Sequence, residues 1–276
     1  MPRFDLHSHS TFSDGLLAPS ALVARAVERG VDVLALTDHD DVGGLVEGRA
    51  SAAQAGIKLV CGAELSVSWE KHTIHVVGLA IDPGNSVLAE GLAAIRAGRS
   101  ARARRIGDAL AAAGIPGAYE GALKYVTSER LVSRTHFARY LVAAGVVREV
   151  KDVFKRYLGP GKPGHVEHGW ATLPQAIGWI RAAGGQAVLA HPGRYKISKA
   201  AMRRLLAEFH AAGGDGIEVL SASHTPEQWK EYASLAREFD LRGSTGSDYH
   251  GPGESWLDLG ALPPLPGGVV PIWKDW

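Results

Sequence analysis

Short apolar segments alternate with helical segments along most of this 276-residue chain, and this alternation limits the folds open to it. The apolar segments at residues 4–10, 31–36, 58–64, 187–190, 216–220 and 241–245 have the character of β-strands, and most segments between them carry apolar residues at helical spacing. Residues 67–75 predict a tight strand–turn–strand, so that one further strand runs antiparallel to the rest. Alternating strands and helices favour a parallel sheet with helices outside it. We therefore predict an α/β fold with seven strands in a closed or nearly closed barrel, and an open doubly wound sheet as the alternative.

Side chains that can bind metal ions stand at or just beyond the ends of these strands. They are the six histidines and three carboxylates His7, His9, Asp14, His39, Glu64, His75, His191, Asp248 and His250. His7 and His9 leave one face of a strand roughly 7 Å apart, and His75 joins the group if its strand reverses near residues 70 and 71. Barrels carry their active sites at the C-terminal ends of their strands. Because burying nine such groups unpaired would be costly, we predict two or three divalent ions, with manganese first and zinc or iron as alternatives.

The remaining composition excludes several classes of protein. A single cysteine, Cys61, excludes an internal disulfide and a thiolate zinc cluster, and it is typical of a reducing compartment. The chain contains no run of about 18 apolar residues and begins without a signal-peptide pattern. We expect a cytoplasmic protein with no membrane association.

The motifs His7-x-His9…Asp14, Thr37-Asp38-His39, Gly62-Ala63-Glu64, His75, Ala190-His191-Pro192 and Gly246-Ser247-Asp248-x-His250 resemble those of the PHP (polymerase and histidinol phosphatase) superfamily. The resemblance implies a distorted seven-stranded (β/α) barrel, a trinuclear metal centre and phosphoester hydrolysis with water as the nucleophile. It assigns His7, His9 and Asp248 to one ion. Glu64 would bridge this ion to a second ion at His75 and His191, and the third ion would lie at Asp14, His39 and His250.

Residues 83–171 form a long insertion between a first barrel part, residues 1–82, and a second part, residues 172–276. Within residues 96–165, fourteen Lys and Arg stand against five Asp and Glu. Basic residues on helices are mostly solvated, but some of these positions favour binding of an anion. Residues 87–113 read as one helix in which Arg99 and Arg102 continue the apolar stripe, and a buried arginine can bind a phosphate through two parallel hydrogen bonds.

A second helix is predicted to begin at Ser133, with Arg134 and His136 in its first turn, where free backbone N–H groups favour anions. An ordinary capped helix with surface charges is the alternative. Loop position alone adds Arg194, His224 and Lys162 as weaker candidates near the rim. His224 or His136 could act as the general acid.

The insertion resembles the bacterial PHP branch that acts on 3′,5′-nucleoside bisphosphates, and the resemblance implies removal of the 3′-phosphate. The alternatives are 5′-3′ exoribonuclease activity on short RNA and hydrolysis of histidinol phosphate. A scaffold stabilised by metals and C–N hydrolysis of the amidohydrolase type are the hypotheses from other classes. The expected partner is a nucleotide or short RNA, with no obligate protein partner.

Overall fold

The sheet consists of short strands that surround a buried interior. The computed structural model describes residues 2–126, 131–255 and 257–276. Its strands are β1 (Phe4–Asp5), β2 (Val33–Leu36), β3 (Lys58–Trp69), β4 (His72–Leu79), β5 (Ala171–Thr172), β6 (Gln186–Leu189), β7 (Gly216–Ser221) and β8 (Arg242–Gly246). Hydrogen-bonded neighbours follow the order β1-β2-β3-β4-β6-β7-β8, and β5 pairs with β3 off this path.

Strand β4 is the one that reverses direction. It pairs antiparallel with β3 and β6, whereas the pairs β1–β2, β2–β3, β6–β7 and β7–β8 are parallel. The first and last strands then meet: the N–H of Leu6 donates to the carbonyl of Thr245 at 2.9 Å, and Ser8 pairs in parallel with Tyr249. The prediction of a nearly closed barrel with one antiparallel strand is confirmed, and the open-sheet alternative is not.

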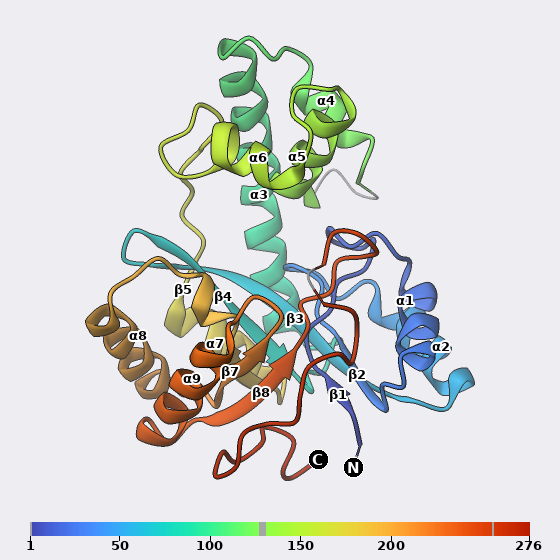
Figure 1. Cartoon of the computed structure of the whole chain (residues 1–276), viewed down its shortest axis with the longest axis vertical. Helices are drawn as coiled ribbons and strands as arrows, with labels where there is room; N and C mark the ends of the chain where they lie inside the picture. Colours follow the sequence, from blue (N-terminus) through green and yellow to red (C-terminus); the bar gives the residue numbers. More distant parts are fainter. Residues whose placement is uncertain (1, 127–130, 256) are drawn as a thin grey trace.

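Five helices pack around the barrel (Figure 1). They are α1 (Pro19–Glu28), α2 (Leu45–Ala55), α7 (Leu173–Ala182), α8 (Lys199–Ala211) and α9 (Pro226–Glu238). Thr172 caps α7, because its side chain accepts a hydrogen bond from the N–H of Gln175. None of the helices in the described parts of the chain is both long and apolar enough to cross a lipid bilayer.

The basic insertion forms a separate helical lobe above the barrel (Figure 1). It contains α3 (Ser86–Ala112), α4 (Ala118–Leu123), α5 (Arg134–Ala143), α6 (Val150–Val153) and η2, a π-helical segment (Phe154–Leu158). The long helix α3 joins the two parts: Leu88 and Leu92 pack into the barrel core, whereas Ile106 and Leu110 pack into the core of the lobe. One continuous helix therefore sets the position of the lobe over the barrel rim. The division of the chain at residues 82 and 171 stays a prediction.

The C-terminal segment packs against the bottom of the barrel. The ring of Trp273 stacks on Phe4 with centroids 4.2 Å apart, and the indole N–H of Trp276 donates to Gln186. Both tryptophans thus serve the fold and do not stand at the rim.

Candidate metal centre and anion pocket

Glu64 lies at the centre of the predicted ligands. Its Oε1 atom is 2.8 Å from both Nδ1 of His75 and Nε2 of His191. Its Oε2 atom is 3.3 Å from Nε2 of His7 and from Nε2 of His9. The antiparallel β3–β4 pairing makes this possible, because Ser66 faces His75 and Glu64 is the diagonal neighbour of His75. The two oxygens thus face different groups of imidazoles, which is the geometry of a carboxylate that can bridge two ions.

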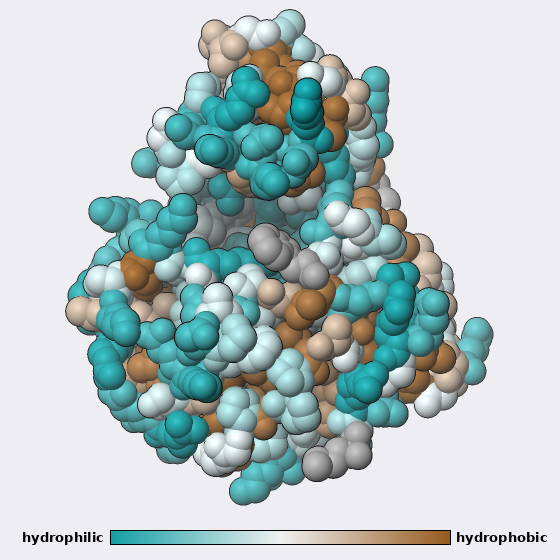
Figure 2. Space-filling model, in the orientation of Figure 1, coloured by the Kyte–Doolittle hydropathy of each residue, from teal (hydrophilic) through white to brown (hydrophobic). Residues whose placement is uncertain are grey.

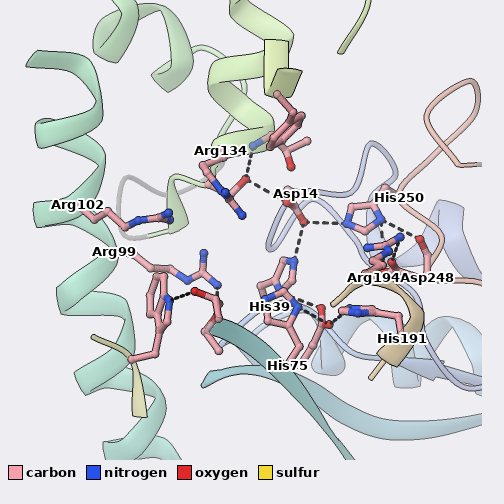
Figure 3. Close-up of a pocket in the computed structure, with 17 residues that line it drawn as sticks. Asp14, His39, His75, Arg99, Arg102, Arg134, His191, Arg194, Asp248 and His250 are labelled. Carbon is pink, nitrogen blue, oxygen red and sulfur yellow. Dashed lines mark hydrogen bonds and ion pairs between the residues drawn. The ribbon is translucent and has the colours of Figure 1, made fainter. Parts of the chain in front are cut away.

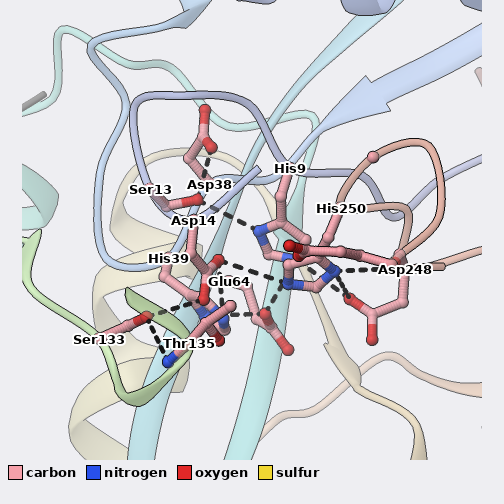
Figure 4. Close-up of polar contacts among 12 residues, drawn as sticks. His9, Ser13, Asp14, Asp38, His39, Glu64, Ser133, Thr135, Asp248 and His250 are labelled. Carbon is pink, nitrogen blue, oxygen red and sulfur yellow. Dashed lines mark hydrogen bonds and ion pairs between the residues drawn. The ribbon is translucent and has the colours of Figure 1, made fainter. Parts of the chain in front are cut away.

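The other ligands collect in overlapping groups around Glu64. Within each group, the ligand atoms all lie within 4.8 Å of one another. The first group is His7, His9, Glu64 and Asp248, the second is His9, Asp14, His39 and His250, and the third is His39, Glu64 and His75. His191 joins them through its contact with Glu64. Figure 4 shows the side chains of Asp14, His39 and His250 turned toward this centre. The structure therefore brings all nine predicted ligands together.

The charges of the cluster keep its carboxylates ionised. Burial alone would raise the pKa of Glu64, but His75, His39 and His7 hold it well below the usual range. The pKa of Asp14 is lowered in the same way against its burial by His39 and His250, and that of Asp248 by Arg194 and His7. Burial, together with Arg194, lowers the pKa of His191 to about 3. Ionised carboxylates and a neutral imidazole are the forms that bind metal ions.

Several buried atoms of the cluster have unmet bonding capacity. His39 Nδ1 and Glu64 Oε2 lie 2.9 Å apart, but neither these two atoms nor Asp14 Oδ1 forms a hydrogen bond of good geometry in the described parts of the chain. Buried polar atoms are rarely left in this state without an ion or water. The donor set, carboxylate oxygen and imidazole nitrogen without thiolate, suits manganese, zinc or iron. The residues present therefore fit a centre for divalent ions.

An outer layer of carboxylates holds these ligands, and the sequence argument assigned it no role. Glu218 on β7 accepts a hydrogen bond from Nδ1 of His7 at 2.6 Å and another from the N–H of His191 at 2.6 Å. Asp38 accepts from the hydroxyls of Ser10 and Ser13, both at 2.6 Å, and fixes the turn that leads to Asp14 (Figure 4). The one available signal for Glu218 was an acidic residue inside an otherwise apolar strand.

A cavity of about 240 Å³ opens above the ligand cluster and below the helical lobe. Figure 2 shows the surface hollowed where the lobe meets the barrel, with hydrophilic side chains around it. Its lining includes Asp14, His39, Glu64, His75, His191, Asp248 and His250 on one side. Of the predicted substrate-binding residues, the cavity is lined by Arg99, Arg102, Ser133, Arg134 and Arg194.

Arg102 and Arg134 supply positive charge that no carboxylate of the described residues neutralises. Arg102 projects from α3 and Arg134 from the start of α5 toward the same cavity (Figure 3). Nε of Arg102 donates to the carbonyl of Val166 at 3.1 Å, and Arg134 donates to the carbonyl of Leu158 at 3.4 Å. Neither forms an ion pair with an acidic residue within the described ranges. Burial and the neighbouring Arg134 and Arg99 lower the pKa of Arg102 to about 9, which shows that the cations crowd one another. An anion placed between them would relieve this repulsion.

Arg99 differs from these two because it already has a protein partner. Its guanidinium is buried against Asp40, a residue with a φ of 51°, and also donates to Ser66 at 2.8 Å. The predicted partner of Arg99 is a phosphate, and the structure shows Asp40 in its place. Trp170 adds an aromatic wall here, with Arg99 5.1 Å and Arg102 5.4 Å from its ring centroid.

Arg194 lies beside the ligand cluster, on the short helix η3 (Pro192–Arg194) that follows His191. Its Nη2 atom is 2.6 Å from Oδ2 of Asp248, and its side chain is 43% exposed at the cavity. The structure thus places Arg194 at the rim, as loop position predicted, and pairs it with a candidate ligand.

Two of the predicted residues and one weaker candidate do not line the cavity. His136 folds back to accept a hydrogen bond from the N–H of Ser133, completing a capping box at the start of α5. His224 is held by backbone on both sides, the carbonyl of Val219 at 3.2 Å and the N–H of Gly193 at 3.1 Å. Lys162 is exposed and outside the lining. The structure therefore places neither histidine where a general acid would meet the substrate.

Comparison with known proteins agrees with this arrangement. The family model described as PHP domain matches residues 5–91. A 3′,5′-nucleoside bisphosphate phosphatase of Chromobacterium violaceum is 50% identical over 275 residues, which cover 100% of this chain and 96% of that protein. The chain belongs to the PHP family. A 5′-3′ exoribonuclease of Haemophilus influenzae is 46% identical over 99% of this chain and 98% of its own length.

A solved structure extends the likeness to the whole PHP fold. An amidohydrolase from Chromobacterium violaceum with bound sulfate superimposes with a TM-score of 0.96 at 50% identity, covering 99% of this chain and 95% of that one. The shared fold includes the helical lobe, because the match extends over nearly the entire chain. The predicted PHP membership is confirmed.

Proposed function

We propose that this PHP protein is a metal-dependent phosphatase that removes the 3′-phosphate from 3′,5′-nucleoside bisphosphates such as adenosine 3′,5′-bisphosphate. One observation carries the proposal: a cluster of metal ligands and the cations Arg102 and Arg134 line the same cavity. A substrate with two phosphates can occupy both ends at once. The 50% identity to the Chromobacterium violaceum phosphatase supports the same substrate class.

The metal centre would be held by the nine clustered residues. His7, His9 and Asp248 would bind one ion, His75 and His191 a second, and Glu64 would bridge the two; Asp14, His39 and His250 would bind a third. Divalent ions in these positions would supply Lewis-acid activation of the phosphoryl group and of the attacking water. We infer manganese as the preferred ion, with zinc and iron as alternatives; the ligands, carboxylates and imidazoles without sulfur, suit all three.

The remaining pocket residues would bind and orient the nucleotide. Arg102 and Arg134 would hold the 5′-phosphate, which does not react, and so fix the 3′-phosphate against the ligand cluster. Arg194 has further N–H groups besides the one bonded to Asp248, and these could neutralise charge on the reacting phosphoryl oxygens. None of these cations reads a base edge, so we expect little selectivity among nucleobases.

Short RNA with a 5′-phosphate is a second candidate substrate, supported by the likeness to the Haemophilus influenzae exoribonuclease. The same pocket would hold the terminal phosphate while the next phosphodiester lies at the ligand cluster. A cytoplasmic location and the lack of an obligate protein partner stay predictions.

The proposal is tested by reconstitution. Protein stripped with a chelator and reloaded with Mn²⁺, Zn²⁺ or Fe²⁺ is assayed for phosphate release from adenosine 3′,5′-bisphosphate and histidinol phosphate, and for release of mononucleotides from 5′-phosphorylated short RNA. The bisphosphate should be the best substrate, and His9→Ala and Glu64→Ala should abolish turnover. Full turnover by either variant in metal-supplemented buffer, or a preference for histidinol phosphate, would contradict the proposal. If the protein is only a scaffold, chelation should lower its melting temperature, and neither the metal-loaded nor the stripped protein should show turnover.

A further inference from the structure

Helix α5 of the insertion contacts the candidate ligand Asp14 in two ways. The hydroxyl of Ser133 donates to Oδ2 of Asp14 at 3.0 Å. This leaves Oδ1 of Asp14 without a hydrogen bond in the described parts of the chain, 3.3 Å from Nε2 of His250. Two turns further along the helix, Nη2 of Arg139 donates to the backbone carbonyl of Asp14 at 2.5 Å. The lobe therefore holds both the carboxylate and the backbone of Asp14.

Arg139 also binds the segment that follows His250. Its Nε and Nη2 atoms donate to the two carboxylate oxygens of Glu254 at 2.8 and 2.7 Å. Arg139 is 8% exposed, so this two-point contact is largely shielded from water. A planar guanidinium fixes the direction of such a contact as well as its distance. One buried side chain thus joins the Asp14 turn to the Glu254 segment.

The two segments that Arg139 joins also meet on the side of the metal ligands. The N–H of Leu16 donates to the carbonyl of His250 at 2.6 Å, and the hydroxyl of Ser255 accepts from the N–H of His250 at 2.8 Å. Asp14 lies in a turn, and His250 lies beyond the end of β8, so neither ligand is held by a regular strand. Ligands on turns need such outside support to keep a metal-binding geometry.

We propose that Arg139 is a positioning residue for the metal subsite formed by Asp14, His39 and His250, with Glu254 as its anchor. The inference rests on the metal centre of the proposed function and extends it. The insertion would then complete one metal subsite and would not serve substrate binding alone. Arg139 acts only through Asp14 and the Glu254 segment, because it does not line the cavity.

The test measures metal binding directly. Metal-stripped wild type, Arg139→Gln and Glu254→Gln are titrated with Mn²⁺, and free Mn²⁺ is followed by electron paramagnetic resonance. Changes in groups that orient ligands typically weaken metal binding 10- to 100-fold. Arg139→Gln should weaken one Mn²⁺ site about tenfold or more and leave the other sites unchanged. Glu254→Gln should show a smaller loss, because the bond from Arg139 to the Asp14 carbonyl remains.

Arg25→Gln is the matched control, because Arg25 forms the same two-point contact, with Asp258 at 2.9 and 2.7 Å; its guanidinium also lies over the ring of Tyr249 but touches none of the nine ligand side chains. It should lower the melting temperature without changing Mn²⁺ binding. The inference is wrong if Arg139→Gln only lowers the melting temperature and binds Mn²⁺ as the wild type does. If Arg139→Gln does not fold, unchanged Mn²⁺ binding by Glu254→Gln overturns it. If the wild type releases no phosphate but Arg139→Gln still weakens Mn²⁺ binding, the proposed substrate is wrong and the inference stands.

Discussion

The Nδ1 atom of His7 lies 2.6 Å from Oε1 of Glu218, and both side chains are buried. The second oxygen of Glu218 accepts the N–H of His191 at 2.6 Å, so one carboxylate orients two candidate ligands. Because Nδ1 of His7 is engaged, its Nε2 atom is the one that faces Glu64 and Asp248. A carboxylate behind a histidine ligand fixes the ring and raises its basicity.

We therefore predict that Glu218→Gln weakens Mn²⁺ binding about 10- to 100-fold. A glutamine has one acceptor oxygen where two are needed, and its amide would face the N–H of either His7 or His191. Glu208→Gln is the control, since Glu208 also accepts an aromatic N–H, that of Trp69 at 2.7 Å, outside the centre. Equal Mn²⁺ affinity in the two variants, measured by titration, would exclude an orienting role for Glu218.

Arg134 should distinguish the bisphosphate from a small phosphomonoester. A charge-assisted hydrogen bond contributes about 1.5–3 kcal/mol, so Arg134→Ala should lower kcat/KM for adenosine 3′,5′-bisphosphate by roughly ten- to hundredfold. Activity on p-nitrophenyl phosphate, which lacks the second phosphate, should be nearly unchanged. Arg156→Ala removes an exposed cation from the same lobe and should affect neither substrate. Equal losses on both substrates would remove Arg134 from the 5′-phosphate site.

Arg99 should matter for stability as well as for catalysis. Asp40 is fully buried, and Arg99→Ala would leave its charge without its ion-pair partner. Breaking a buried pair on one side costs about 3–5 kcal/mol, which urea denaturation can measure. Arg134→Ala, which removes a 3.4 Å hydrogen bond to the Leu158 carbonyl and a cation–π contact with Phe154 but no ion pair within the described ranges, should cost much less. If Arg99→Ala were as stable as the wild type and lost only bisphosphate turnover, the ion pair would not be structural.

The stability of the metal-free protein should fall between pH 7 and pH 5 in part through His224. Burial lowers the pKa of His224 from 6.5 to about 4, and its ring accepts a hydrogen bond from Gly193 that protonation would break. Since the unfolded chain binds this proton more readily, stability is present above pH 6.5 and is lost as the pH falls toward 4. Between pH 7 and 5 the wild type should lose about 2 kcal/mol more than His224→Gln. Parallel pH profiles for the two proteins would show that His224 does not titrate this way.

Most of the ligand positions could be predicted because they belong to short motifs at strand ends. Glu64 and His75 lie within β3 and β4 instead, and the reversal of β4 that brings them together followed from a turn near Glu70 and Lys71. A nearly closed barrel was predicted from the number and alternation of the strands, but the pairing that closes it, between Ser8 and Tyr249 at the other end of the chain, was not. Glu218 was missed for a similar reason. Alternation within its strand does not reveal which ligand lies behind it.

For the predicted substrate-binding residues, the sequence indicated position but not contacts. The helical stripe correctly placed Arg99 inside, yet its partner Asp40 lies 59 residues away in a left-handed conformation that no periodicity reports. Loop position placed both Arg194 and His224 at the rim. The structure turns Arg194 into the cavity and ties His224 to backbone groups of Val219 and Gly193.

The position of cleavage tests the account most directly. The Mn²⁺-loaded protein is incubated with adenosine 3′,5′-bisphosphate, and the products are separated by chromatography and assigned by ³¹P NMR. Because Arg102 and Arg134 would retain the 5′-phosphate while the 3′-phosphate lies at the ligand cluster, the account predicts adenosine 5′-monophosphate and one equivalent of phosphate. Formation of adenosine 3′-monophosphate, or no release of phosphate by fully loaded protein, would contradict it.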